Sequence, residues 1–164
     1  MKNELILMCG IPGSGKSTWA KNFIDRGLVD VIISRDTIRF SMVAEDEPYF
    51  SKEKQVFKIF VEAIDRALEQ GLTVVADATH LNRASRLKLL NALTVKPDMI
   101  DIFWVNTSLK KALEQNELRK GTRAYVPPEQ IEKMYNAFEV PVEREGDWHY
   151  DRIYTPIGVP TNER

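Results

Sequence analysis

A short segment near the start of the chain combines three glycines with a lysine and a serine: Gly10-Ile11-Pro12-Gly13-Ser14-Gly15-Lys16-Ser17. Glycines permit positive backbone angles and close approach, so successive N–H groups can point at phosphate oxygens. Lys16 would then reach the outer phosphates of a nucleotide, and Ser17 would ligate Mg²⁺. A glycine-rich turn with a chance Lys-Ser pair is the alternative, but an apolar run precedes the segment and helix-forming residues follow it. The pattern therefore predicts a phosphate-binding loop (P-loop), whose nucleotide-binding residues are Gly10, Pro12, Gly13, Ser14, Gly15, Lys16, Ser17 and Thr18.

Transfer of a phosphoryl group also requires an acceptor site, for which Asp36 and Arg39 are candidates. Asp36 follows the apolar run 31–34, which places it at the carboxyl edge of the expected sheet, where open α/β folds bind ligands. Asp36 can orient an acceptor hydroxyl or take its proton, and Arg39, one helical turn later, can hold a substrate phosphate. Asp36 also fits a plain helix N-cap equally well. Spacing alone leaves both interpretations open.

A third group of polar residues follows the apolar run 74–76. Asp77 ends that run, as a second acid on the magnesium or acceptor side does in P-loop enzymes, although this pattern is weak by itself. Thr79, in the loop beyond, can donate to a substrate oxygen. We assign Asp77 and Thr79 to the acceptor site, and Asp77 with Ser17 to the metal. A loop histidine usually faces solvent, so His80 is left outside the catalytic set.

The segment from about 119 to 127 is basic and rich in turn residues, and helical patterns flank it. This arrangement predicts a lid. Guanidinium groups of Arg119 and Arg123 closing over a transferred phosphoryl group would stabilise its charge, so both are assigned to catalysis and to nucleotide binding. Cations near the end of a helix also interact with its dipole, which explains Arg119 and Lys120 but explains Arg123 less readily.

Apolar runs of strand length alternate with longer amphipathic stretches, a pattern typical of a parallel sheet covered by helices. We expect a single α/β domain over residues 1–164 with the P-loop NTPase fold, four to five mostly parallel strands, helices on both faces and a small, adenylate-kinase-like helical lid. The expected strands are 5–9, 31–34, 72–76 and 99–105, with an edge strand at 150–154 before a frayed tail. The expected helices begin at Lys16, within 51–70, after the caps Asn82 and Ser108, and at Pro128.

The composition limits the environment and the partners of this chain. Its 164 residues are 43% hydrophobic, enough for one packed core. The 23 basic and 24 acidic residues nearly balance, so no large basic field can capture long nucleic acid non-specifically. Cys9 is the single cysteine, which excludes an intramolecular disulfide and favours a core position in a reducing compartment. No apolar run reaches membrane-spanning length, and 4–9 is too short for a signal sequence, so we expect a soluble, cytoplasmic protein.

Taken in order, these motifs resemble the phage-type 5′-hydroxyl polynucleotide kinase domain. The matching residues are Gly10 to Ala20, Ser34-Arg35-Asp36 with Arg39, Asp77-Ala78-Thr79, and Arg119-Lys120-Gly121-Thr122-Arg123 before Val126-Pro127. The resemblance covers about Leu5 to Pro141 and implies ATP as the donor. It also implies that Asp36 acts as general base, that Arg39 contacts the acceptor phosphate, and that the lid arginines contact the donor phosphates. Where the family often has Asn after Asp-Ala-Thr, this chain has His80, and its lid carries an additional aromatic residue, Tyr125.

The leading hypothesis is transfer of the ATP γ-phosphoryl group to a 5′-hydroxyl of RNA or DNA. A small-molecule kinase acting on a sugar, a nucleotide sugar or an antibiotic is the alternative. The balanced charge and the absence of an evident aromatic and basic strip favour that alternative, because binders of extended single strands usually combine the two. A non-catalytic nucleotide-dependent switch ranks last. The chain has a complete set of candidate donor and acceptor residues, and an enzyme explains that set without a switch. Oligomeric state is left open.

Overall fold

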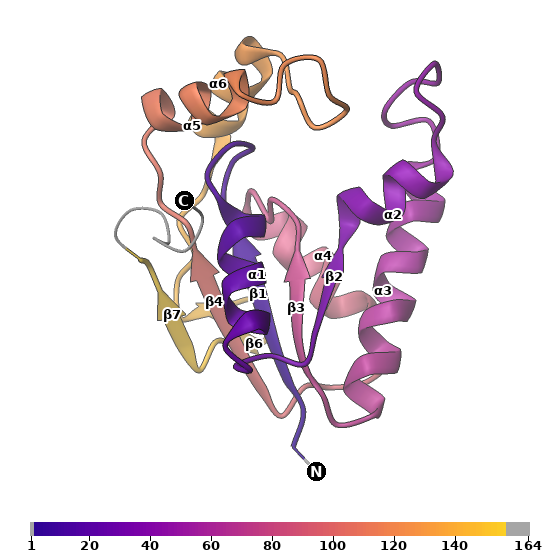
Figure 1. Cartoon of the computed structure of the whole chain (residues 1–164). Coiled ribbons are helices and arrows are strands. Elements are labelled where there is room, and N and C mark those ends of the chain that lie inside the picture. Colours follow the sequence, from indigo (N-terminus) through magenta and orange to yellow (C-terminus); the bar gives the residue numbers. More distant parts are fainter. Residues whose placement is uncertain (1, 157–164) are drawn as a thin grey trace.

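The computed structural model describes residues 2–156, and its centre is a five-stranded sheet in which every neighbouring pair is parallel (Figure 1). The strand order is β2-β3-β1-β4-β7. A small antiparallel pair, β5 and β6, lies outside this sheet. The strands are β1 (Glu4–Cys9), β2 (Val31–Ser34), β3 (Thr73–Asp77), β4 (Met99–Trp104), β5 (Arg144–Glu145), β6 (Trp148–His149) and β7 (Arg152–Tyr154). The predicted parallel α/β sheet is confirmed, including β7 as its edge strand.

Six helices accompany the sheet in the described part of the chain: α1 (Lys16–Asp25), α2 (Arg35–Met42), α3 (Glu53–Glu69), α4 (Arg83–Ala92), α5 (Leu109–Glu117) and α6 (Pro128–Ala137). Asn82 and Ser108 cap α4 and α5 through their side chains, as predicted. Ser34 caps α2, because its Oγ accepts a hydrogen bond of 3.2 Å from the Thr37 amide. The N-cap interpretation of Asp36 is therefore wrong, since that position belongs to Ser34 and Asp36 lies in the first turn.

The alternation of side chains along β1 divides the core into two layers. Leu5, Leu7 and Cys9 pack in one buried cluster with apolar residues of α3 and α4. Met8 points to the other face and shares a second cluster with Ala20 of α1. Successive side chains of a strand face opposite sides, so a nearly continuous apolar strand buries both of its faces. The expectation of helices on both faces is confirmed, and Cys9 is a core residue.

Helices α5 and α6 stand over the carboxyl end of the sheet, where Figure 1 shows them above the turn that follows β1. Their inner face rests on the P-loop, because Ile11 packs against Ala112 and Ile131 in a third apolar cluster. Asn116 fixes the loop between the two helices, since its side chain donates to the Val126 carbonyl at 2.7 Å and accepts from the Val126 amide at 3.0 Å. The predicted helical lid is thus present and packed onto the P-loop.

The strand register brings three chain segments to one edge of the sheet. Asp77 at the end of β3 pairs with Ser34 at the end of β2 and with Met8 of β1. Just beyond, the Gly10 amide donates to the Thr79 carbonyl at 3.0 Å, which joins the P-loop to the loop after β3. The polar residues predicted for the site therefore gather at the carboxyl edge.

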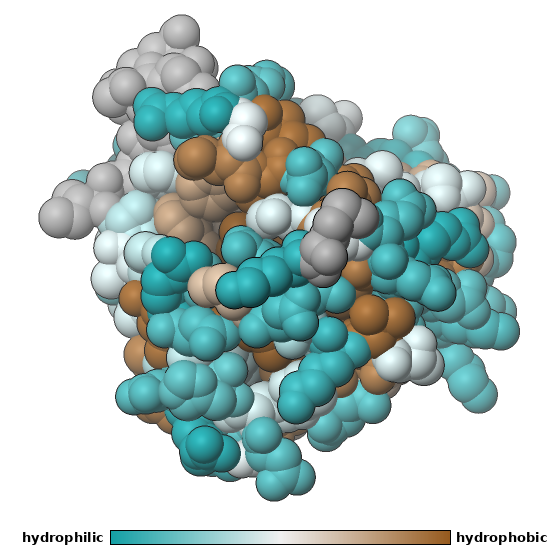
Figure 2. Space-filling view, turned by 90° about the horizontal axis from the view of Figure 1, so that it is seen from below, coloured by the Kyte–Doolittle hydropathy of each residue, from teal (hydrophilic) through white to brown (hydrophobic). Residues whose placement is uncertain are grey.

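Figure 2 views the molecule from the opposite end, where hydrophilic side chains predominate between smaller apolar patches.

Two further sequence expectations concern the chain as a whole. Between residues 2 and 156, no helix is both long enough and apolar enough to cross a membrane. The tail that we expected to fray after Tyr154 falls mainly in residues 157–164, which lie outside the described residues.

Candidate active site

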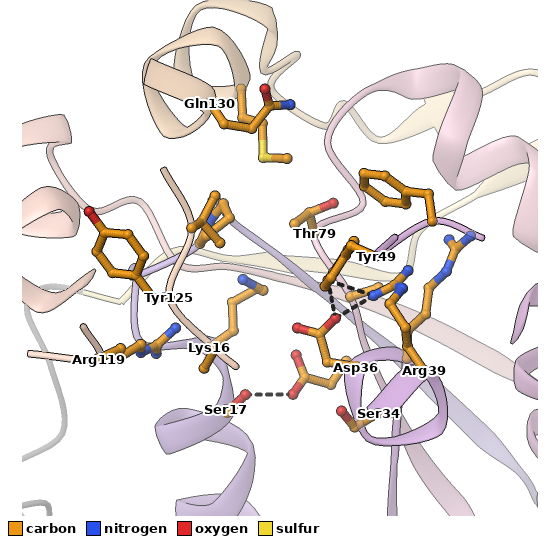
Figure 3. Close-up of a pocket in the computed structure, with 18 of the residues that line it drawn as sticks. Lys16, Ser17, Ser34, Asp36, Arg39, Tyr49, Thr79, Arg119, Tyr125 and Gln130 are labelled. Atoms are coloured by element: carbon orange, nitrogen blue, oxygen red, sulfur yellow. Dashed lines mark hydrogen bonds and ion pairs between the residues drawn. The ribbon is translucent and has the colours of Figure 1, made fainter. Parts of the chain in front are cut away.

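A cavity of about 520 Å³ opens at the carboxyl edge of the sheet, between the P-loop, the ends of β2 and β3, and the lid. Most side chains predicted to do chemistry line it: Lys16, Ser17, Asp36, Arg39, Asp77, Thr79 and Arg119. Figure 3 shows Lys16, Asp36 and Thr79 around a common space, with Tyr125 and Gln130 contributed from the lid side. The fold thus collects residues from four separate parts of the sequence into one hollow.

The P-loop backbone has the conformation that its glycines allow. Gly13 and Gly15 adopt φ angles of 83° and 100°, in the left-handed region that side chains with a Cβ rarely enter. A Cβ on Gly13 would also collide with the backbone of Ala112 in α5. No side chain caps α1 within the described residues, so the amides of its first turn remain for an anion, as at other phosphate-binding helix termini.

Lys16 lies at the floor of this hollow. Its Nζ donates to the Ile11 carbonyl of the same loop at 3.2 Å. Burial lowers the pKa of Lys16, while the carboxylate of Asp77 opposes that effect. A partly desolvated ammonium beside free helix amides is suited to nucleotide phosphates, because fewer water molecules compete for the lysine.

Ser17 and Asp77 form a pair at the base of the cavity, where the Ser17 hydroxyl donates to Asp77 Oδ2 at 2.9 Å. Asp77 is 6% exposed. Its burial raises the pKa of the carboxyl group, whereas Lys16 and the Ser17 hydrogen bond act in the opposite direction. A hydroxyl and a carboxylate fit Mg²⁺, which takes oxygen ligands, often only one or two of them from protein, and completes its shell with water and phosphate. Ser17 and Asp77 could therefore hold that ion beside the P-loop.

The opposite side of the cavity is organised around Arg39, a buried residue of α2. The carboxylate of Glu53, at the start of α3, accepts hydrogen bonds from the Arg39 guanidinium: Nε donates to Oε2 at 3.1 Å and Nη2 donates to Oε1 at 2.7 Å. Arg35 donates to the same carboxylate at 2.5 Å. Although burial opposes it, the hydrogen bond and charge of Glu53 raise the pKa of Arg39. Arg39 is thus held rigidly beside Asp36, with which it also forms an ion pair.

Asp36 projects from the first turn of α2 with its side chain 58% exposed. Its Oδ1 accepts hydrogen bonds from Arg39 and from the Tyr49 hydroxyl. Sequence reasoning did not identify Tyr49, Phe50 or Glu53, which also line the cavity. They belong to no phosphate-binding motif. The one available signal was the aromatic pair directly after Pro48, shortly before a helix whose first turn carries an acid.

His80 corrects an expectation, because it is 5% exposed rather than facing solvent. It is the one non-glycine residue of the described chain with positive φ, at 42°. Its Nδ1 lies 2.6 Å from the Met8 carbonyl, and burial lowers its pKa to about 4. Asn and His are among the residues that tolerate this backbone region best, which gives a physical reason for His80 where related sequences often have Asn.

The two lid arginines have different positions. Arg119 lines the cavity, whereas Arg123 does not. Arg123 reaches across to α2 instead, where Nη1 donates to the Phe40 carbonyl at 3.1 Å and Nη2 donates to the Val43 carbonyl. Its guanidinium also lies 4.6 Å from the centroid of the Phe40 ring. These contacts hold Arg123 at the end of α2, outside the cavity, and its role at the donor phosphates stays a prediction.

A family profile described as an AAA domain matches residues 5–141. The chain belongs to this family. The match begins in β1 and ends after α6, so it includes the P-loop, the two site acids Asp36 and Asp77, and the lid.

Relatives of this AAA-domain chain carry kinase names. An L-seryl-tRNA(Sec) kinase from Methanococcus maripaludis is 27% identical over 84% of the chain. A protein of Autographa californica nuclear polyhedrosis virus, named as a bifunctional polynucleotide kinase and RNA ligase, is 28% identical over 82%. The chain spans 53% and 21% of these two proteins. The sequence resemblance to polynucleotide kinases is therefore confirmed.

Among solved structures, the Pnkp1/Rnl/Hen1 RNA repair complex contains a chain that superposes with a TM-score of 0.72 at 23% identity. That match covers 83% of this chain and 44% of the other. At this identity, the similarity supports the P-loop fold described above.

Proposed function

We propose that this chain is an ATP-dependent kinase that transfers the γ-phosphoryl group to a hydroxyl acceptor, the 5′-hydroxyl of RNA or DNA. The observation that carries the proposal is that one cavity holds the residues assigned to the donor on one side and those assigned to the acceptor on the other. Lys16 and the Ser17–Asp77 pair line the donor side, and Asp36 faces them from α2. The motif order and the viral relative support a polynucleotide as the acceptor.

In the proposed reaction, the acceptor oxygen bonds to the γ-phosphorus while the bond from that phosphorus to the β–γ bridging oxygen breaks. ADP leaves, and the proton of the acceptor hydroxyl passes to Asp36. Lys16 and Arg119 would stabilise the charge on the transferred group. Mg²⁺, held by Ser17 and Asp77, would neutralise charge on the phosphate oxygens. Asp36 is exposed enough to meet an acceptor, and the side chain of Arg39 lies beside it.

A small-molecule acceptor is the second candidate, and Glu53 is the observation that favours it. Glu53 already pairs with both Arg35 and Arg39. With Asp36, the acceptor side therefore carries two carboxylates against two guanidinium groups. This balance weakens the attraction for the phosphates of a nucleic-acid chain. It suits a neutral polyol or nucleoside as well as a 5′ end.

Labelled ATP distinguishes the two candidates. The purified chain is incubated with [γ-³²P]ATP and Mg²⁺, together with RNA and DNA oligonucleotides that end in a 5′-hydroxyl. The same oligonucleotides with a 5′-phosphate are the matched control, and nucleosides and sugars form a parallel panel. We expect label on the 5′-hydroxyl strands alone. Label confined to a nucleoside or a sugar would replace the polynucleotide by the second candidate.

Asp36→Asn tests the acceptor side directly. Loss of a positioned proton acceptor should lower kcat by about 10²- to 10⁴-fold while ATP binding is retained. Binding is followed by calorimetry and turnover by label transfer. Asp25→Asn, which alters a surface acid paired with Lys21 at the end of α1, is the control and should keep full activity. Unchanged turnover in Asp36→Asn would remove Asp36 from this role.

A further inference from the structure

Tyr49 occupies a defined position in the loop between α2 and α3. Its ring lies against the Arg39 guanidinium, with 4.4 Å between the guanidinium carbon and the ring centroid. Phe50 meets it edge-on at 4.6 Å and Phe40 at 6.2 Å between centroids. These contacts hold the ring although Tyr49 is 40% exposed. They fix the phenol oxygen at the cavity wall (Figure 3).

The Tyr49 hydroxyl is part of a directed chain of hydrogen bonds. It accepts from Arg39 Nη1 at 2.7 Å and donates to Asp36 Oδ1 at 2.5 Å. Arg39 Nη1 also donates to the same Oδ1. Oδ1 of Asp36 therefore receives two donors, whereas no hydrogen bond from the described residues reaches Oδ2. The carboxylate is consequently held in one orientation, with Oδ2 left for an incoming hydroxyl.

Tyr49 is poorly suited to accept the proton itself. Burial and the neighbouring Asp36 carboxylate raise its pKa, so the phenol stays protonated and remains a donor. Glu53 engages Nε and Nη2 of Arg39, so the guanidinium reaches Oδ1 of Asp36 through Nη1 alone. Without the phenol, the carboxylate would keep one donor on Oδ1 and could rotate about its bond to Cβ. The Tyr49 phenol is thus the uncharged donor in this network, and it restricts the orientation of the Asp36 carboxylate.

We propose that Tyr49 is a positioning residue: by donating to Oδ1 of Asp36, it directs Oδ2 toward the acceptor hydroxyl. This inference rests on the proposed kinase function. Tyr49 acts through Asp36 and has no direct part in the phosphoryl transfer. Its contribution is to maintain the geometry in which the carboxylate receives the proton.

The test is a double-mutant cycle between Tyr49→Phe and Asp36→Asn, with label transfer to a 5′-hydroxyl oligonucleotide as the readout. Tyr49→Phe removes only the phenol oxygen and keeps the ring contacts. In the otherwise wild-type chain it should lower kcat about tenfold and leave the KM for ATP unchanged within about twofold. In the Asp36→Asn background, the same substitution should lower the residual kcat by less than about twofold. Tyr154→Phe, a comparably exposed tyrosine on β7, should leave activity unchanged.

Each result decides a different question. An equal tenfold loss in both backgrounds would mean that Tyr49 has a merely structural role, and an unchanged kcat would mean that it has none. Either result overturns the inference while the kinase function stands. A wild-type chain that labels no acceptor would overturn the kinase function itself and, with it, the role of Tyr49. Thermal melts of all variants show whether Tyr49→Phe retains the wild-type fold.

Discussion

At the scale of single residues, the region around the cavity combines groups whose partners are adjacent in the chain with groups whose partners lie far along it. The P-loop could be predicted because its glycines, lysine and serine are contiguous and the required backbone is local. Tyr49 could not, since it reaches Asp36 across 13 positions through a loop. His80 was misplaced for a similar reason, because its partner is the Met8 carbonyl, 72 positions away. The roles assigned to Asp36, Arg39 and Asp77 stay predictions.

His80 carries a prediction about pH. Burial lowers its folded-state pKa to about 4, against a value of 6.5 for the exposed group. Below pH 6.5 the unfolded chain therefore binds a proton that the folded chain rejects, and stability falls as the pH drops toward 4. At pH 5, this single group should cost about 2 kcal/mol relative to pH 7. Asparagine also tolerates positive φ and does not titrate in this range. His80→Asn should therefore lose less stability than the wild type between pH 7 and pH 5.

Urea unfolding of both chains at pH 7 and pH 5 measures the difference. His149→Asn is the matched control, because that side chain is 46% exposed and pairs with Glu143 at the surface. If the wild type and His80→Asn lose the same amount, the buried His80 ring is not the group responsible.

At the scale of elements, the helices and strands followed from apolar periodicity, but the position of the lid relative to α2 did not. The sequence indicates a basic loop between two helices. It does not show that one lid arginine lines the cavity while the other reaches the end of α2. Arg123 binds the Phe40 and Val43 carbonyls at the end of α2, where a cation also interacts favourably with the helix dipole. A tertiary contact thus decides between two equally basic side chains.

This contact predicts that Arg123 holds the lid to α2 when no nucleotide is bound. Arg123→Ala removes two hydrogen bonds and the contact with the Phe40 ring. Amides in the lid loop, 119–127, and in the loop after α2 should then exchange hydrogen about tenfold faster, because local opening costs less. Hydrogen–deuterium exchange by mass spectrometry on the nucleotide-free chain measures both segments.

Lys120→Ala is the control within the same loop. Its side chain is 69% exposed and pairs with Glu117 of the lid itself, so exchange in the loop after α2 should stay at the wild-type rate. Equal rates in wild type and Arg123→Ala would show that the lid does not depend on this contact. A raised KM for ATP in Arg123→Ala would indicate, in addition, that Arg123 moves to the phosphates once nucleotide binds.

At the scale of the whole molecule, the parallel α/β class of the sheet could be predicted, but the way the segment before β7 is attached to the fold could not. The stretch 140–148 is polar and charged, which favours a solvated surface. Instead, Glu145 is 1% exposed and pairs with the fully buried Arg86 of α4. The two are 59 positions apart, so no local pattern connects them. The polar composition of this stretch therefore gives no sign that it contributes one partner of a buried ion pair.

This pair links three parts of the fold. Arg86 donates to Glu145 through Nε and Nη2, both at 2.8 Å, and its Nη1 donates to the His80 carbonyl at 2.9 Å. Tyr150 completes the cluster by donating to Glu145 at 2.6 Å. Helix α4, the cavity loop after β3 and the β5–β6 hairpin are therefore joined through one guanidinium. A buried charge that loses its partner keeps its desolvation cost, so the cluster is sensitive to the removal of either partner.

Glu145→Ala should accordingly lower the free energy of unfolding by about 3–5 kcal/mol, because Arg86 would remain buried without its counter-ion. The double replacement Arg86→Met with Glu145→Leu should lose less than Glu145→Ala, because it removes both charges and leaves none unpaired. Urea unfolding at pH 7 measures both variants. Glu143→Ala, in the same segment but exposed and paired with His149, should change stability far less. If Glu145→Ala costs no more than Glu143→Ala, the pair does not hold the hairpin to α4, and the orientation of the cavity loop has another source.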